Sequence, residues 1–166
     1  IGVSAPGPHV AELEEWGIRH CALRHATRSM SLTHDVAAFA ELRARFRDLR
    51  PDIVHTHNPK PGVYGRLAAR AARVPVVVNT VHGLYATPED PWVKRSVVYA
   101  LERLASTCSQ AELLQNPEDR PVLRRLGVPE RKLTVIGNGI DLERFDPTAV
   151  SPQERAALRR EWGAGP

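Results

Sequence analysis

Short apolar runs alternate with longer amphipathic segments along this chain of 166 residues. The apolar runs predict β-strands, because short apolar runs bounded by turn residues are typical of buried strands. They lie at residues 1–5, 18–23, 53–57, 74–80, 112–115 and 133–136. Helices are predicted between them, and this alternation is typical of right-handed β-α-β crossovers. The pattern therefore predicts an α/β fold with a doubly wound parallel sheet and helices on both faces.

Two of the predicted helices carry a regular apolar stripe. At residues 35–49, apolar side chains recur at steps of three and four, which places them on one helix face. Another helix begins at Asp90 and Pro91, an N-cap residue followed by a first-turn proline. Its apolar positions are Val93, Val97, Leu101 and Leu104. We expect both stripes to face the core.

Histidines mark the carboxyl ends of two consecutive strands. The first strand, residues 53–57, ends in a histidine and is followed by Asn58 and Lys60 in a tight turn. The second, residues 74–80, runs into His82. Ligands of open parallel sheets bind just beyond the carboxyl ends of the strands. This edge is therefore predicted to form one wall of a binding site.

The glycines after the first of these turns suggest a close approach of backbone to another group. Gly62 and Gly65 lie at the start of the next helix, where the absence of a side chain permits such an approach. They do not belong to a dinucleotide-binding fingerprint, because no G-x-G-x-x-G occurs. They do not form a Walker loop either, because Lys60 precedes both glycines.

A further tight loop follows the strand at residues 133–136. Asn138 and Gly139 lie within it, and Asn138 is either a turn residue or a ligand contact. Asp141 comes slightly later, and we interpret it as the cap of a short turn leading to Phe145 rather than as a catalytic acid.

Two neighbouring carboxylates, Glu118 and Asp119, also require an interpretation. They follow Asn116 and Pro117, an N-cap and proline that predict the start of a helix. Neighbours in sequence point in different directions on a helix, so the two do not face one substrate together. We interpret them as first-turn residues rather than as a catalytic pair.

Composition indicates a soluble globular protein with 42% hydrophobic and 25% charged residues. The net charge of +4 comes almost entirely from Arg, which indicates either a solvated basic surface or weak attraction to anionic lipid headgroups and phosphorylated substrates. No basic stripe with interleaved aromatics occurs, which argues against nucleic acid as a partner. Cys21 and Cys108 lack metal-ligand spacing and are typical of reduced thiols in a cytosolic protein.

His55 and His57 alternate on one strand and so share a face, an arrangement that can bind zinc in metal-dependent hydrolases. His82 is the obvious third ligand for such a site. The other interpretation is that the pair has a structural or substrate-positioning role. Both interpretations follow from the same spacing.

Five motifs occur in order: R-P-D-I-V-H-T-H at 50–57, K-P-G at 60–62, T-V-H-G at 80–83, Q-N-P-E-D at 115–119, and V-I-G-N-G-I-D at 135–141 with Phe145. Together they resemble the N-terminal domain of family 4 glycosyltransferases, which are retaining enzymes of the GT-B architecture. The similarity is greatest to the group that acts in exopolysaccharide, lipopolysaccharide and undecaprenyl-linked glycan synthesis.

The resemblance implies two Rossmann-like domains that enclose a cleft. Residues 1–150 would form the acceptor-side domain, and residues 151–166 would be a linker and helix leading to an absent C-terminal nucleotide-sugar-binding domain. The family begins with an earlier strand and a Gly-rich loop, whereas this chain opens at Ile1 within a predicted strand. We therefore expect a fragment that lacks the first strand and is inactive alone.

The same resemblance implies roles for individual residues. His82 would lie near the transferred sugar as the catalytic residue, supplying a hydrogen bond as charge develops. Asn58, Lys60 and Gly62 would line the acceptor side, and the loop with Asn138, Gly139 and Asp141 would face the cleft near the hinge. No metal and no cofactor are expected.

The implied donor is a nucleotide-sugar such as a UDP- or GDP-sugar, and the implied reaction is hexosyl transfer to a glycan or polyprenyl-linked acceptor. The implied location is cytoplasmic, with peripheral contact to the inner face of the membrane as an option. The alternatives are a nucleotide-sugar epimerase on the same architecture, a metal-dependent hydrolase that uses His55 and His57, and a non-catalytic binding domain.

Overall fold

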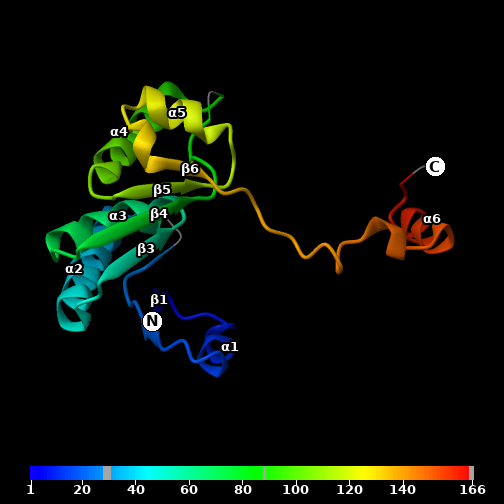
Figure 1. Ribbon diagram of the computed structural model, residues 1–166, viewed down its shortest axis with the longest axis horizontal. Helices are drawn as coiled ribbons and strands as arrows, with labels where there is room; N and C mark the ends of the chain where they lie inside the picture. Colours follow the sequence, from blue (N-terminus) through cyan, green and yellow to red (C-terminus); the bar gives the residue numbers. More distant parts are fainter. Residues whose placement is uncertain (28–30, 88, 165–166) are drawn as a thin grey trace.

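The computed structural model describes residues 1–27, 31–87 and 89–164 (Figure 1). The strands are β1 (Gly2–Ser4), β2 (His20–Ala22), β3 (Ile53–His57), β4 (Val76–Val81), β5 (Ala111–Leu114) and β6 (Leu133–Val135). The helices are α1 (Val10–Glu15), α2 (Leu32–Leu49), α3 (Pro59–Ala71), α4 (Trp92–Ser106), α5 (Asp119–Arg125) and α6 (Pro152–Glu161), with short 3₁₀ turns at Glu130–Lys132 and Pro147–Ala149. Strands and helices thus alternate as the hydrophobic pattern predicts.

The strands form two parallel sheets. β1 pairs with β2, and a four-stranded sheet has the order β3-β4-β5-β6. In the larger sheet His57 lies opposite Thr80, so the carboxyl ends of β3 and β4 are level. Since every pairing is parallel and helices connect the strands, the predicted α/β class is confirmed.

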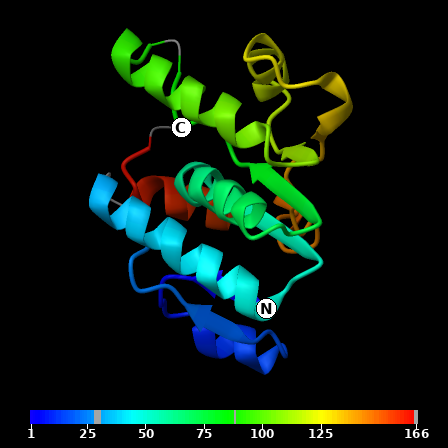
Figure 2. The same ribbon diagram turned by 90° about the vertical axis from the view of Figure 1, so that its left-hand side faces the viewer.

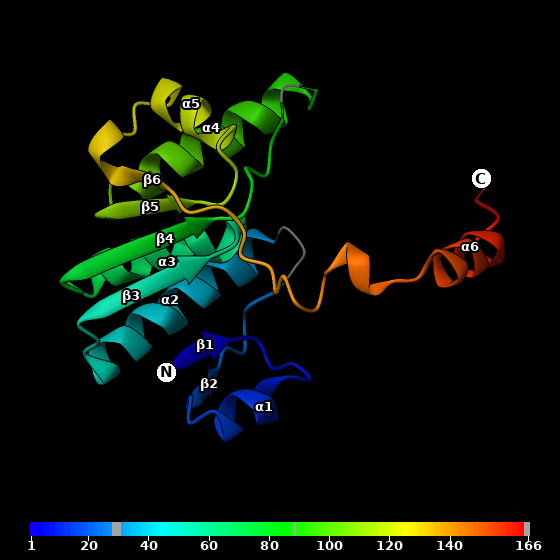
Figure 3. The same ribbon diagram turned by 45° about the vertical axis from the view of Figure 1, so that its right-hand side comes forward.

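The helices that pack on the four-stranded sheet lie on one of its faces. α2 packs on α3, and α3 packs on α4; Figure 2 shows the three helices side by side. Along β3, Val54 and Thr56 face this layer and are buried, whereas the alternate residues Ile53, His55 and His57 are exposed. In the described part of the chain, the other face of β3 is therefore open (Figure 3).

Two apolar clusters hold the helices to the sheet. The larger one joins α2, α3, β3 and β4 and contains Leu23, Ala38, Leu42, Phe46, Val54, Tyr64, Ala68, Ala69 and Val77. The smaller one joins β4, β5, α5 and β6 through Val81, Leu114, Leu123, Val128 and Leu133. Each buried Val, Leu or Phe side chain contributes about 1.5–3 kcal/mol. The stripe predicted at 35–49 is confirmed at Leu42 and Phe46.

A charged cluster is buried between α3, α4 and β5. The guanidinium of Arg66 donates to Glu112 Oε1 at 2.8 Å and to Glu102 Oε2 at 2.9 Å. Burial alone would lower the pKa of Arg66, but the two carboxylates outweigh it and hold that pKa above its usual value. The other oxygen of Glu112 accepts from Asn79 at 2.8 Å. This cluster ties α4 to α3 through polar contacts.

The prediction for the apolar stripe of α4 is wrong. Val93, Val97, Leu101 and Leu104 are exposed, while Glu102, Ala105 and Ser106 form the buried face. The physical reason is the ion pair with Arg66, because a buried guanidinium requires a carboxylate partner and Glu102 supplies it from α4. The apolar side of this helix therefore points to solvent.

The predicted start of α4 is also wrong by one residue. Its N-cap is Pro91, with no side-chain cap. Asp90 instead accepts the backbone N–H of Thr87 at 2.9 Å and pairs with Lys94 at 2.6 Å. Its carboxylate therefore stabilises the loop before the helix as well as the first turn.

The chain leaves the sheet after β6 as an extended segment that carries α6 away from the body of the molecule (Figure 1). Ser151 caps α6 in a reciprocal capping box with Glu154. The final two residues of the predicted 151–166 segment lie outside the described residues. None of the helices in the described ranges has the length and apolar character required to cross a bilayer.

Candidate functional site

Three polar side chains meet at the carboxyl ends of adjacent strands. His57 is the last residue of β3, while His82 and Gln115 directly follow β4 and β5. His57 Nδ1 lies 3.1 Å from His82 Nε2. His82 Nδ1 lies 2.8 Å from Gln115 Oε1. The imidazole of His82 is thus held at both nitrogens, at the edge where the sequence predicts a binding site.

Gln115 determines which nitrogen of His82 carries the proton. Because its amide oxygen only accepts hydrogen bonds, it selects the tautomer of His82 with hydrogen on Nδ1. Nε2 of His82 then has a lone pair, which accepts the Nδ1–H of His57. An incoming hydroxyl that replaces His57 would therefore find a hydrogen-bond acceptor already oriented at His82.

His55 extends this row of imidazoles down β3. Its ring lies 4.2 Å from that of His57, centroid to centroid, and its Nε2 is 2.8 Å from Thr80 Oγ1. The pKa of His55 is lowered by burial and then by His82. The pKa of His57 is lowered by burial and then by His55 and His82. Both imidazoles are therefore predominantly neutral at pH 7.

The metal interpretation of His55 and His57 finds no support. Within the described ranges, no group of three or more His, Cys, Asp or Glu residues could hold a metal ion. One nitrogen of each imidazole faces a protein partner, Thr80 for His55 and His82 for His57. The geometry favours hydrogen bonding over metal coordination.

Asn58 occupies a strained backbone conformation between β3 and α3. Its φ of 68° and ψ of 153° fall in a region adopted almost only by glycine. The carbonyl of Asn58 accepts the backbone N–H of Gly62 at 2.8 Å, which starts α3. Such strain costs on the order of 1–3 kcal/mol and is concentrated at functional sites. The predicted site residue Asn58 therefore lies beside His57 in a conformation that the local sequence does not favour.

Lys60 and Gly62 have partners within the protein. Lys60 Nζ lies 2.7 Å from Asp35 Oδ1 on α2 and donates to the carbonyl of Thr27 at 2.9 Å. A Cβ on Gly62 would lie 3.0 Å from Asn79 Oδ1, so this glycine permits close packing of α3 on β4. Both residues thus hold the helix that follows the site.

The loop after β6 follows a strand that is two positions from β4 in the sheet. Asn138 and Gly139 are exposed, and nothing lies within 4 Å of a Cβ placed on Gly139. Asp141 Oδ1 accepts the backbone N–H groups of Glu143 and Arg144, each at 3.1 Å. The interpretation of Asp141 as a cap is confirmed. The loop starts at the same sheet edge as Gln115, because Ile136 donates its backbone N–H to the carbonyl of Leu114.

A sequence model of Glycosyltransferase Family 4 matches residues 2–144, which is most of the chain. The chain belongs to glycosyltransferase family 4. This family 4 chain is 39% identical over 122 residues to the UDP-Gal:alpha-D-GlcNAc-diphosphoundecaprenol alpha-1,3-galactosyltransferase of Escherichia coli, covering 72% of this chain and 31% of that protein. It is 28% identical over 124 residues to the capsular polysaccharide biosynthesis glycosyltransferase CapM of Staphylococcus aureus, covering 71% of this chain and 32% of that protein. It thus spans about a third of the length of these relatives.

Solved structures support the fold of this family 4 chain. Anabaena Alr3699/HepE in complex with UDP-glucose superposes with a TM-score of 0.65 at 19% identity, over 97% of this chain and 41% of that one. The UDP-GlcNAc 2-epimerase from Neisseria meningitidis bound to UDP-GlcNAc superposes with a TM-score of 0.61 at 22% identity, over 95% of this chain and 44% of that one. At these identities the likeness shows the fold alone, which is the GT-B type.

The sequence of this family 4 chain did not identify Gln115 as a site residue. It indicated for Asp119 only a place in the first turn of a helix. Gln115 follows β5 at the same sheet edge as His82. A polar residue directly after a predicted strand is the sequence feature that could have indicated its place in the site. Burial raises the pKa of Asp119, while a hydrogen bond from the backbone of Leu84 and one from Asn116 oppose that shift. Asp119 therefore fastens the loop that follows His82.

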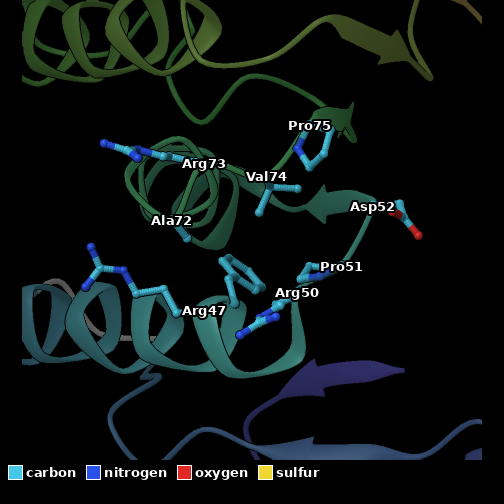
Figure 4. Close-up of a pocket in the computed structure, with 9 residues that line it drawn as sticks. Arg47, Arg50, Pro51, Asp52, Ala72, Arg73, Val74 and Pro75 are labelled. Carbon is cyan, nitrogen blue, oxygen red and sulfur yellow. The ribbon is translucent and has the colours of Figure 1, made fainter.

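The opposite edge of the sheet in this family 4 chain has a hollow of about 380 Å³. Arg47, Arg50 and Arg73 line it beside the carboxyl ends of α2 and α3 (Figure 4). Cations at that end of a helix offset the negative end of its dipole. Arg50 and Arg73 also have positive φ values of 45° and 63°, as residues that terminate helices do. These arginines therefore stabilise the ends of the helices, at the sheet edge opposite to His82.

Proposed function

We propose that this chain is the acceptor-side half of a glycosyltransferase that moves a sugar from a nucleotide-sugar to a lipid-linked glycan acceptor with retention of configuration. The observation that carries the proposal is His82, held at both nitrogens between His57 and Gln115 at the carboxyl edge of the sheet. The E. coli relative, by its name, transfers galactose from UDP-Gal to a diphosphoundecaprenol-linked sugar. Family membership and this pre-oriented imidazole together support the same chemistry.

In the proposed mechanism a sugar hydroxyl takes the place of His57 at His82 Nε2. Gln115 keeps the proton of His82 on Nδ1, so Nε2 accepts the hydrogen bond from the sugar without a change of tautomer. This contact fixes the sugar while charge develops at the reacting carbon and the leaving diphosphate. Hydrogen bonds that strengthen in the transition state contribute to rate rather than to ground-state binding alone.

The proposed donor is a UDP-sugar, bound mainly by a second domain, and no metal or cofactor is needed on the acceptor side. HepE supports this choice, because its structure contains UDP-glucose and its fold matches. Residues 1–150 would be the acceptor-side domain and 151–166 the link to the donor domain. We propose a cytoplasmic location with peripheral contact to the membrane, and no turnover by residues 1–166 alone.

The test uses the full chain that contains this sequence. Transfer from radiolabelled UDP-sugars to undecaprenyl-diphosphate-linked GlcNAc is measured for wild type and His82→Ala, with exposed His25→Ala as the matched control. We expect His82→Ala to lose about 100-fold or more in kcat and His25→Ala to be unchanged. Equal rates for wild type and His82→Ala would contradict the assigned role.

The product also separates the alternative enzyme classes. A new glycosidic bond with the donor's anomeric configuration, seen by NMR, supports retaining transfer. Conversion of the UDP-sugar to an epimer without acceptor would support an epimerase instead. Binding of donor or acceptor with neither product would support a non-catalytic domain.

A further inference from the structure

The hollow between the carboxyl ends of α2 and α3 gathers positive charge from two helices (Figure 4). Its volume of about 380 Å³ lies within the range of small-molecule sites. The side chains of Arg47 on α2 and Arg73 after α3 extend to the same side of it. Arg50, the C-cap residue of α2, also lines it. Three guanidinium groups that are distant in the sequence or on different elements therefore meet at one place.

Protein groups do not balance the positive charge of this hollow. In the part of the chain that the structure describes, no carboxylate forms an ion pair with Arg47, Arg50 or Arg73. Asp52 is the single acidic residue among the described lining residues. Each of the two helix ends contributes about half a negative charge. About one positive charge therefore remains, which an anion would neutralise.

Two of these arginines occupy positions at which glycine is the less strained residue. The φ values of Arg50 and Arg73 are 45° and 63°. Helices that end in this left-handed conformation usually have glycine there. Ending the helix therefore requires a long side chain at neither position. Backbone strain of this kind is concentrated at functional sites, which indicates that the guanidinium groups have a further use.

Apolar side chains form most of the remaining lining. Phe46 is buried, and Val74 and Pro75 line the hollow with it. An apolar wall lowers the local dielectric response, which strengthens the attraction between a guanidinium and an anion. The planar guanidinium fork matches phosphoryl oxygens and binds them through two parallel hydrogen bonds. A ligand with two phosphoryl groups would therefore be able to contact both helix ends at once.

We propose that the hollow lined by Arg47, Arg50 and Arg73 binds the diphosphate group of a small ligand. Arg47 and Arg50 bind it from α2, and Arg73 binds it from the end of α3. The bound diphosphate thus joins the two helix ends. This site lies at the sheet edge opposite to His82, so it is separate from the proposed transfer site and does not depend on the proposed function.

The experiment is a calorimetric titration of the full chain that contains this sequence with inorganic diphosphate in metal-free, low-salt buffer. The test variant is Arg47→Gln with Arg73→Gln. The matched control is Arg45→Gln with Arg70→Gln, which removes the same charge from α2 and α3 at exposed positions that do not line this hollow. Asp52→Asn is the third variant. Thermal melts without ligand verify that each variant folds.

We expect wild type and control to bind diphosphate and the test variant to bind at least about tenfold more weakly. Asp52→Asn should bind about threefold more tightly, because a repulsive carboxylate is removed. A diphosphate site elsewhere, such as the proposed donor site, would remain in every variant and so does not affect this comparison. Titration with ADP identifies the source of the group. Tighter binding of ADP than of diphosphate supports a nucleotide on the apolar wall, and equal binding supports inorganic diphosphate.

Equal affinity in wild type and test variant overturns the proposal. Sulfate that binds as tightly as diphosphate also overturns it, because the hollow would then hold an adventitious ion only. If the test variant does not fold, Asp52→Asn decides the question, since an affinity equal to that of wild type contradicts the proposal. Sugar transfer is measured in a separate assay, so its absence would refute the proposed function and leave diphosphate binding unaffected.

Discussion

Arg66 and Glu112 form an ion pair of 2.8 Å in which neither side chain is exposed to solvent. Glu112 also accepts from Ser109 and Asn79, and Asn79 in turn accepts from Thr56 at 2.8 Å. The pair thus connects α3 with β5, β4 and β3, directly beneath the strand ends that carry the histidines. It fixes the relative positions of the elements that build the candidate site.

Replacing Arg66 should strongly destabilise the protein. Arg66→Met leaves the buried carboxylates Glu102 and Glu112 without their cation, and we expect a loss of about 3–5 kcal/mol in the free energy of unfolding. Urea unfolding followed by circular dichroism measures this loss. Arg124→Met is the control, because Arg124 pairs with Glu130 at the surface and its loss should cost less than about 1 kcal/mol. Equal effects in the two variants would contradict a structural role for the buried pair.

Stability should fall as the pH falls below neutrality. The folded-state pKa values of His55 and His57 lie below the ordinary value of 6.5, so in this range the unfolded chain binds more protons than the folded one. Their contribution is present above pH 6.5 and is lost as the pH falls toward the folded-state values. The urea midpoint should therefore be lower at about pH 5.5 than at about pH 7.5.

The double variant His55→Asn with His57→Asn checks the origin of this pH dependence. Because Asn does not titrate, the difference between the two urea midpoints should become smaller than in wild type. An unchanged difference would assign the pH dependence to other groups.

Asn58→Gly should make the protein more stable. Glycine adopts a φ of 68° with a ψ of 153° without steric strain, so we expect a gain of up to about 1–3 kcal/mol, reduced by the greater entropy of the unfolded chain. The melting temperature and kcat are measured on the same preparations. A rise in melting temperature with a fall in kcat would show that the strained Asn58 serves function. A fall in melting temperature would contradict the predicted strain.

Two glycines provide a matched test of packing. A Cβ on Gly65 would lie 2.8 Å from Thr56 Cγ2, whereas nothing lies within 4 Å of a Cβ on Gly139. Thr56 is buried, so Gly65→Ala should cost about 1–3 kcal/mol from overpacking. Gly139→Ala should change stability by less than about 0.5 kcal/mol. Differential scanning calorimetry of both variants measures these effects, and equal melting temperatures would disprove the close contact.

Gln115→Glu should change the pH dependence of transfer. A carboxylate at this position favours the positively charged imidazole of His82 over the neutral one. Since the proposed role requires a neutral His82, the acid limb of the kcat/KM profile should move to higher pH. Gln115→Met should lower kcat at all pH values, because no oxygen then selects the tautomer. If the pH profile of Gln115→Glu is identical to that of wild type, the role of Gln115 in orienting His82 is contradicted.

The amino-acid sequence by itself determined the alternation of strands and helices and the edge at which the site lies. Local periodicity marks β3 at the predicted residues 53–57, and β4 within two residues of its predicted bounds. Because parallel strands end at a common edge, His57 and His82 had to lie near one another. These inferences need only the sequence near each element and a general rule of sheet geometry.

The tertiary structure alone decided the partners of side chains that are distant in the sequence. Lys60 faces Asp35 and Gln115 faces His82, because the packing of α2 on α3 and the register of β4 and β5 bring these groups together. The orientation of α4 has the same origin. Its apolar stripe predicts a core-facing side, but the pairing of Glu102 with buried Arg66 turns the polar side inward. A buried charge requires its partner in three dimensions, and the periodicity of a single helix does not contain that requirement.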